Sequence, residues 1–134
     1  MREILFRAKR KNWSELPKEE WWVEGDVIHE PYGVVIQYYV EKRRIKVVID
    51  PETLCQYTGL PDKNGKRIWE NDICEMVYDG GVYIYVIVWD AEELDFKGTN
   101  GKEKYGSNFE YLGCCEEIVR IGNVFDNPEL LEEE

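Results

Sequence analysis

The sequence predicts a mostly β domain, and three observations lead to this fold class. Short apolar segments with period-two alternation recur along the chain, separated by turn residues. Asn64-Gly65 and Asp79-Gly80-Gly81 are strong hairpin signals, because Asn, Asp and Gly tolerate the positive φ angles of tight turns. Almost no segment has the 3.6-residue period of an amphipathic helix. With 134 residues, 43% of them hydrophobic, the chain is long enough for one packed core.

The N-terminal part of the chain predicts alternating strands and short connections. Residues 12–20 predict a loop with one helical turn after Pro17. Gly25-Asp26 is expected to break the second strand. The expected strands span residues 4–9, 21–28, 34–40 and 44–50, with a charged hairpin tip at residues 41–43 and a 3₁₀ turn starting at Pro51 after the N-cap Asp50.

The stretch from Gln56 to Cys74 is the most informative part of the sequence. Asn64-Gly65 is expected at the tip of a hairpin, and the side chain of Asp62 is expected to bond the backbone at the entry to this turn. Asn71-Asp72 predicts a second turn, with Asn71 in a left-handed conformation and Asp72 as a capping residue. We interpret the stretch first as a hairpin that defines the fold. The alternative is a recognition loop.

The C-terminal half predicts a long apolar strand and a polar loop. Residues 82–89 are apolar on both faces and should form a central strand. Residues 90–108 contain several glycines and predict a surface loop with an interrupted strand near residues 94–96. The remaining expected elements are strands at residues 73–78, 109–112 and 117–121 and a short helix that starts at Pro128 after Asn127.

Taken together, the elements predict one domain over residues 1–134. We expect an N-terminal β lobe over residues 1–50, packed on an SH3-like small-barrel lobe over residues 51–126. A short helix and an acidic tail follow over residues 127–134. No apolar run has the roughly 18 residues that a membrane span needs, and the N-terminus lacks a signal-peptide pattern, so we expect a cytoplasmic protein without membrane contact.

The charge distribution disfavours nucleic acid as a partner. The chain has 17 Lys and Arg against 28 Asp and Glu, a net charge of −11, and such a field repels phosphate. The acidic excess favours solubility or a basic protein partner. Two segments, residues 1–11 and 42–46, are instead rich in Lys and Arg. We interpret them as solvated strand ends and a hairpin tip, and a nucleic-acid surface would require their arginines to converge on one face: Arg2, Arg7, Arg10, Arg43 and Arg44.

The cysteines and the single histidine predict no metal or cofactor. Cys55, Cys74, Cys114 and Cys115 contain no C-x-x-C pair, and a vicinal pair is poorly placed to give one zinc ion two tetrahedral ligands. His29 is the only histidine. We expect reduced cysteines, with Cys55 and Cys74 as small buried hydrophobic residues.

The sequence predicts no catalytic residues. His29 is expected on a turn beside Glu30-Pro31, where a lone histidine is incidental, and no Gly-rich loop is present to hold a phosphate. An acid/base pair such as Asp72 with Glu75 is conceivable, but such pairs arise by chance at this density of acids.

Aromatic side chains are the remaining candidates for a binding surface. We interpret them first as core packing, and the alternative is a platform for a protein or for stacked bases. They are Tyr38 and Tyr39 on opposite faces of one strand, and Tyr83, Tyr85 and Trp89, which share a face of the long strand with Ile87.

Three sequence blocks resemble the YopX family of small phage and prophage proteins from low-GC Gram-positive bacteria. The central block reads Gln-Tyr-Thr-Gly-Leu-x-Asp-Lys-Asn-Gly-Lys-x-Ile-x-Glu-x-Asp-Ile, opened by Asp50-Pro51-Glu52-Thr53. The other blocks are the opening ten residues and the ending Gly-Asn-x-x-x-Asn-Pro-Glu-Leu-Leu. Ala8 and Asn71 stand where family members often carry Gly, which is a mild departure. The family has no established biochemical role.

Two hypotheses about function follow from the residues and the resemblance. The first is a non-enzymatic phage or prophage accessory protein that binds an unidentified host or phage protein and self-associates, with no binding residues assigned. The second is a small-barrel module associated with nucleic acid through the basic segments and aromatic side chains.

Overall fold

The computed structural model describes residues 4–100 and 109–131 and contains two compact units, Met1–Tyr57 and Thr58–Glu134. Both units consist of antiparallel strands joined by tight turns and short 3₁₀ segments, which confirms the mostly β prediction. The division after Tyr57 lies within the strand that connects the two units.

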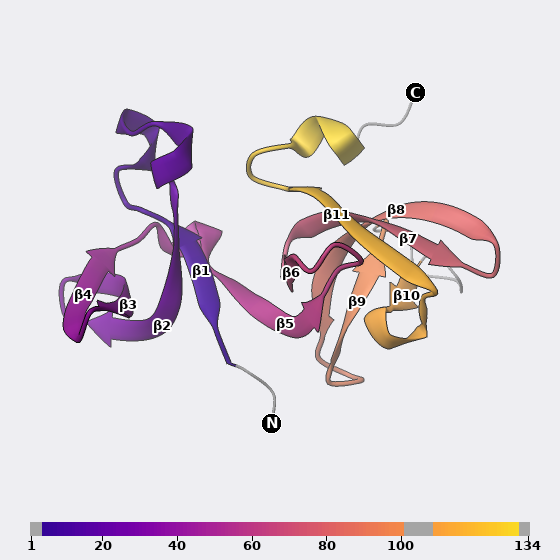
Figure 1. Ribbon diagram of the computed structural model, residues 1–134, viewed down its shortest axis with the longest axis horizontal. Helices are drawn as coiled ribbons and strands as arrows, with labels where there is room; N and C mark the ends of the chain where they lie inside the picture. Colours follow the sequence, from indigo (N-terminus) through magenta and orange to yellow (C-terminus); the bar gives the residue numbers. More distant parts are fainter. Residues whose placement is uncertain (1–3, 101–108, 132–134) are drawn as a thin grey trace. The chain divides into compact units, whose positions relative to one another are not determined.

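The first unit is a small curved sheet (Figure 1). Its strands are β1 (Phe6–Lys9), β2 (Trp22–Glu30), β3 (Gly33–Val40), β4 (Arg43–Val48) and the start of β5 (Cys55–Pro61), with the 3₁₀ turns η1 (Trp13–Glu15), η2 (Lys18–Glu20) and η3 (Pro51–Thr53). β2 pairs with β1 through its first half and with β3 through its second half. The expected break at Gly25 is wrong. β2 runs straight through it, because Gly25 lies against the backbone of Gln37, where a Cβ would be 2.2 Å from the carbonyl oxygen.

Two basic residues of the first strand are buried, contrary to the expectation of solvated strand ends. Lys9 is 2% exposed, and its Nζ lies 3.9 Å from the ring centroid of Trp13 and 4.4 Å from that of Trp21. Arg7 is 4% exposed, and its guanidinium lies 4.4 Å from the Trp22 ring centroid. Aromatic faces attract cations, so these tryptophans stabilise charges that would otherwise be costly to bury.

The second unit is built on a five-stranded antiparallel sheet of order β10-β9-β8-β7-β11 (Figure 1). Its elements are the end of β5, then β6 (Arg67–Trp69), β7 (Asp72–Tyr78), β8 (Gly81–Asp90), β9 (Asp95–Thr99), β10 (Phe109–Tyr111), η5 (Leu112–Cys114), β11 (Glu117–Asn123) and η6 (Pro128–Leu131). The predicted turns are confirmed by positive φ angles at Asn71 (70°), Asp79 (47°) and Gly80 (79°).

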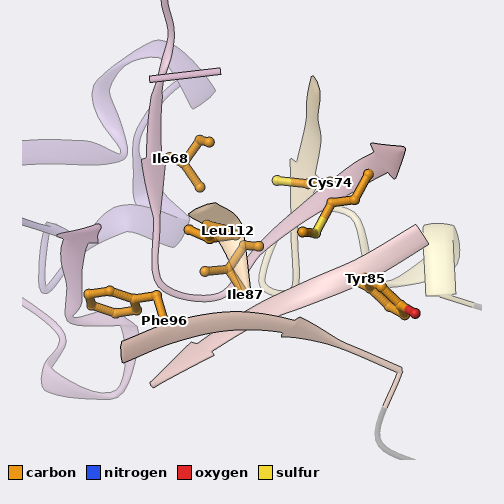
Figure 2. Close-up of a cluster of buried hydrophobic side chains, with 7 residues drawn as sticks. Ile68, Cys74, Tyr85, Ile87, Phe96 and Leu112 are labelled. Atoms are coloured by element: carbon orange, nitrogen blue, oxygen red, sulfur yellow. The ribbon is translucent and has the colours of Figure 1, made fainter. Parts of the chain in front are cut away.

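The core of the second unit lies on one face of this sheet (Figure 2). Cys74 and Met76 of β7 face Tyr85 and Ile87 of β8, because alternate residues of neighbouring strands share a face. Ile68, Phe96 and Leu112 complete the cluster and come from β6, β9 and η5. The buried side chains in the second half of β8 thus fit the predicted central strand.

Two expectations for the C-terminal half need correction. The strand near residues 94–96 is the regular strand β9, which starts at Asp95 and runs to Thr99. The rest of the expected loop, residues 101–108, lies outside the described residues. In the described residues, the expected short C-terminal helix is the 3₁₀ turn η6, which starts at Pro128 as predicted.

Candidate binding site

The first half of β8 exposes apolar side chains on both faces. Val82, Tyr83 and Ile84 have exposed fractions of 65%, 43% and 45%. The type I′ turn at Asp79-Gly80 fixes the start of this strand, and the twist of such a turn matches that of the two strands it joins. Clustered apolar exposure of this kind marks interaction surfaces more often than scattered single residues do.

A groove of about 620 Å³ runs along this part of the strand. A groove over one face of a sheet would be lined by alternate residues of a strand, because successive side chains point to opposite faces. Here consecutive residues line it, so the groove follows the edge of β8. Its lining is Val82, Tyr83, Ile84, Tyr85, Val86, Val88, Thr99, Asn100, Leu130 and Leu131.

The residues beside this groove are acidic. Glu75 of β7 is exposed and stands directly opposite Ile84 in the pairing of β7 with β8. Asp79 lies in the turn that precedes β8, and Glu129 precedes the lining residue Leu130 in η6. Among the described residues that line the groove, none carries a charged side chain. An apolar groove with carboxylates at its border favours an apolar segment that carries positive charge.

The two units differ sharply in charge. The first unit, residues 1–57, contains 10 Lys and Arg and 10 Asp and Glu, so its net charge is zero. The second unit, residues 58–134, contains 7 Lys and Arg and 18 Asp and Glu, a net charge of −11. The whole net charge of the chain therefore belongs to the unit that carries the groove.

The basic residues described in the second unit are mostly engaged with acids. Lys97 contacts Asp90 at 3.2 Å, and the Nζ of Lys63 lies 2.8 Å from Glu117. Arg120 contacts the buried Asp72 at 3.3 Å through Nε. Each of these cations is thus paired with an acid of the same unit.

The predicted hairpin around Asp62 has a structural role. The Asp62 carboxylate is 6% exposed and accepts hydrogen bonds from the backbone N–H groups of Asn64, Lys66 and Arg120, at 2.9, 2.9 and 3.0 Å. Burial of this carboxyl raises its pKa, but the three N–H donors outweigh that effect and hold the pKa below its ordinary value. Asp62 thus joins the hairpin tip to β11. A second, smaller hollow of about 390 Å³ lies beside it, between the hairpin and η5.

The structure separates the acids that the sequence considered as a catalytic pair. Asp72 is fully buried, accepts a hydrogen bond from the backbone N–H of Trp69 at 2.7 Å, and contacts Arg120, as a turn-capping residue would. Glu75 is exposed three residues along the same strand, so the two side chains lie on opposite faces. His29 lies on β2 and is exposed; the expectation that it lies on a turn is wrong.

The cysteines described by the structure are free thiols. Cys55 and Cys74 are buried, as expected, and Cys115 is half-buried. Burial is the main cause that raises the pKa of the Cys74 thiol far above its ordinary value, and the nearby Asp72 carboxylate adds to it. Within residues 4–100 and 109–131, no group of three or more His, Cys, Asp or Glu side chains has a metal-binding arrangement.

The predicted aromatic and basic candidates are distributed over both units. Tyr83, Tyr85 and Trp89 share a face of β8 with Ile87. The rings of Tyr83 and Tyr85 are stacked, with their centroids 5.6 Å apart. Tyr38 is half-buried and Tyr39 is exposed on β3 of the first unit. Among the arginines, Arg43 and Arg44 are exposed at the start of β4, while Arg10 donates to the backbone of Glu20 and Arg2 lies outside the described residues.

Comparison with known proteins places the chain in a family. The family model described as "YopX protein" matches residues 6–132. The chain belongs to the YopX family. A solved structure, the crystal structure of protein EF1440 from Enterococcus faecalis, is similar over 98% of this chain and 100% of that chain, with 20% identity and a TM-score of 0.56. At this identity the likeness concerns the fold alone. No curated protein matches the chain.

Family membership confirms the resemblance but assigns no function to the groove. The sequence indicated the groove only in part, through residues 82–89, which are apolar at every position. That run was predicted to be a central strand, and β8 is the central strand of its sheet. Its first half is exposed because β9 ends opposite Val86, and the sequence does not specify that end point. Among the described residues, no helix is long and apolar enough to cross a membrane.

Proposed function

We propose that this YopX-family chain is a non-enzymatic protein that binds another protein through the β8 groove. The observation that carries the proposal is an open apolar groove on the unit that holds the entire net charge of −11. Apolar surface at the centre of an interface supplies affinity, and surrounding charge steers a partner of opposite sign. We also propose that the chain is a phage or prophage accessory protein that acts inside the host cell, and its membership of the YopX family supports this proposal.

The absence of an assembled acid/base site among the described residues supports a binding role. His29 is exposed on β2, and none of the hydrogen bonds described above joins it to an acid. Asp72 and Glu75 lie on opposite faces of β7. General acid–base catalysis needs groups that reach one reacting atom together. We also propose that the second unit is an SH3-like small barrel, because its pattern of strands and turns resembles that of such barrels. The proposed binding role does not depend on this fold assignment.

The nucleic-acid hypothesis receives less support. It needed five arginines on one face, yet Arg7 is buried against Trp22 and Arg10 is held by Glu20. Arg43 and Arg44 remain as exposed cations at one hairpin. Lys42 adds a third exposed cation there, and Lys46 is paired with Glu30 at 2.9 Å. So few unpaired charges on a unit of zero net charge make a weak phosphate site.

Affinity capture with matched variants tests the proposal. The tagged chain, an Ile84→Glu variant and a Leu94→Glu variant are used to capture partners from host lysate after nuclease treatment. Both positions are exposed, Ile84 in the groove and Leu94 (73% exposed) in the turn between β8 and β9, and both changes add one negative charge. We expect a stoichiometric protein partner that is lost with Ile84→Glu and kept with Leu94→Glu. Equal capture by all three chains would exclude the groove as the binding site.

A further inference from the structure

The backbone of β8 directs its polar groups alternately to two sides. In the two-residue hairpin, Tyr78 and Gly81 form the hydrogen-bonded pair that closes the turn. Tyr83 and Tyr85 therefore direct their N–H and C=O groups toward β7, while Val82 and Ile84 direct theirs away from it. An independent contact confirms this alternation. The carbonyl of Ile87, which points to the same side as those of Tyr83 and Tyr85, accepts a hydrogen bond of 2.8 Å from the backbone N–H of Asn71, the residue before β7.

The side toward which Val82 and Ile84 point has no strand partner in the described part of the chain. β9 pairs with β8 from Asp90 to Val86, where Val86 stands opposite Thr99, and the pairing ends there. Within the described residues, two N–H and two C=O groups thus form an open edge in the middle of the sheet. The groove occupies the same place, because residues 82–86 line it in succession and Thr99 and Asn100 line it as well. An open sheet edge is a template for an added strand.

The side chains and charges around this edge define what it would bind. Val82 and Ile84 present aliphatic surface on one face, and Tyr83 presents an aromatic ring on the other, so a bound strand meets apolar surface with both sets of its side chains. Among the described residues, Glu75, Asp79 and Glu129 border the groove. The complementary ligand is an extended aliphatic segment flanked by cations.

We propose that the groove binds an extended, aliphatic segment flanked by Lys or Arg, and that this segment adds to the open edge of β8 as an extra strand. The inference rests on the proposed function and specifies its partner and mode of binding. Backbone hydrogen bonds to Val82 and Ile84 supply affinity, the apolar walls select aliphatic side chains, and the acidic border selects basic flanks.

Amide exchange in the intact protein tests this mode of binding. The probe is a synthetic peptide, acetyl-Lys-Lys-Val-Thr-Val-Thr-Val-Lys-Lys-amide, titrated into the isotopically labelled chain and followed by NMR. In the free protein we expect the amides of Val82 and Ile84 to exchange fast and those of Tyr83 and Tyr85 to be protected by β7. Saturation with peptide should slow exchange at Val82 and Ile84 by at least about tenfold, because their N–H groups become paired.

Two control peptides and one variant separate strand addition from other contacts. A peptide with Glu in place of Lys should bind at least about tenfold more weakly, with a smaller difference at high salt. A peptide N-methylated throughout its core cannot donate hydrogen bonds and should not bind. The Ile84→Pro variant loses one N–H on the open edge and none toward β7, so it should keep its fold, checked by circular dichroism, and lose peptide binding.

Three results would overturn the proposal: protection of Val82 and Ile84 in the free protein, equal binding of the basic and acidic peptides, or binding without new protection. Protection that rises with protein concentration alone would assign the edge to a second copy of the chain. If Ile84→Glu abolishes partner capture while the peptide leaves both amides unprotected, the groove still binds a protein and only the added strand is wrong. If capture survives Ile84→Glu, the proposed function itself fails.

Discussion

At the scale of single residues, buried polar groups hold the second unit together at its turns. Asp62 accepts three backbone N–H groups, and Asp72 caps Trp69 while contacting Arg120. Each carboxylate joins segments that are distant in sequence, since Arg120 lies 58 residues after Asp62. A buried acceptor of this kind matters most through the donors it satisfies, because a buried N–H without a partner is costly.

Removal of the Asp62 carboxylate should destabilise the protein. Asp62→Ala leaves the N–H groups of Asn64, Lys66 and Arg120 without this acceptor, and we expect a loss of about 1–3 kcal/mol in the free energy of unfolding. Urea unfolding measures the loss. Glu92→Ala, at an exposed acid of the β8–β9 turn, serves as the control and should change stability little. Equal effects of the two substitutions would show that the three bonds contribute nothing.

The same carboxylate should make stability depend on pH. Burial raises the pKa of Asp62, but the N–H donors lower it more, so the folded-state pKa lies below the ordinary value of 3.8. Such a group stabilises the fold fully above its unfolded pKa, and this contribution is lost as pH falls through the folded pKa. The stability difference between wild type and Asp62→Ala should stay constant from neutral pH to about 5 and shrink below about 4. Urea unfolding at a series of pH values checks this, and a constant difference at low pH would contradict it.

The buried thiols should be inert in the folded protein. Cys74 is fully buried and burial raises its pKa, so little thiolate is present and reagents cannot reach it. We expect iodoacetamide to label Cys115, which is half-buried, before Cys55 and Cys74. Peptide mapping by mass spectrometry under native conditions and in urea measures the order. Labelling of Cys74 at the native rate of Cys115 would show that β7 opens readily.

Residue patterns predicted the local turns but not the burial of cations. The turn at Asn71-Asp72 was predictable because the left-handed backbone and the capping carboxylate depend on near neighbours. The burial of Lys9 was not, because Trp13 and Trp21 reach it only through the path of residues 10–22 and the pairing of β1 with β2. A basic residue in a strand is ordinarily exposed, and tertiary packing overrides that preference here.

At the scale of elements, close approach between β8 and β9 depends on glycine. A Cβ at Gly98 would lie 2.8 Å from the Cβ of Tyr85 and 2.5 Å from the Sδ of Met76. The sulfur belongs to a flexible side chain and can move, but the Cβ of Tyr85 is fixed to its strand. Gly98 therefore lets β9 pair closely with β8 at this point of the sheet, and the end of β9 at Thr99 lies beside the groove.

Substitution of Gly98 should loosen this packing. We expect Gly98→Ala to cost about 1–3 kcal/mol of unfolding free energy through overpacking. Gly113→Ala is the matched control in the same unit, since no atom lies within 4 Å of the Cβ it would add, and its effect should be small. Thermal unfolding of both variants measures the difference. Similar melting temperatures for the two would contradict the close approach of the strands.

The strands themselves were largely predictable, whereas the open edge was not. The hairpins at Asp79-Gly80 and the apolar character of β8 follow from local sequence. Where β9 stops relative to β8 depends on long-range register, which a period-two pattern leaves undetermined. The sequence therefore predicted the central strand but not the exposure of its first half.

At the scale of the whole molecule, the net charge is unevenly divided between the two units. The first unit is neutral in sum and buries two of its cations under tryptophans, and the second carries −11. A count over the full chain conceals this division. It makes the second unit the natural target of a basic partner and leaves the first unit with little attraction for phosphate.

This division predicts weak or absent binding of nucleic acid. A fluorescent single-stranded oligonucleotide should show no anisotropy change with the protein at moderate salt, because the exposed Arg43 and Arg44 are too few to offset a net charge of −11. Poly-lysine should instead shift NMR signals of residues 58–134, with affinity that falls as salt is raised. An Arg43→Gln, Arg44→Gln double variant provides the control. Salt-sensitive oligonucleotide binding that this variant abolishes would reverse the ranking of the two functions and place the ligand on the β3–β4 hairpin.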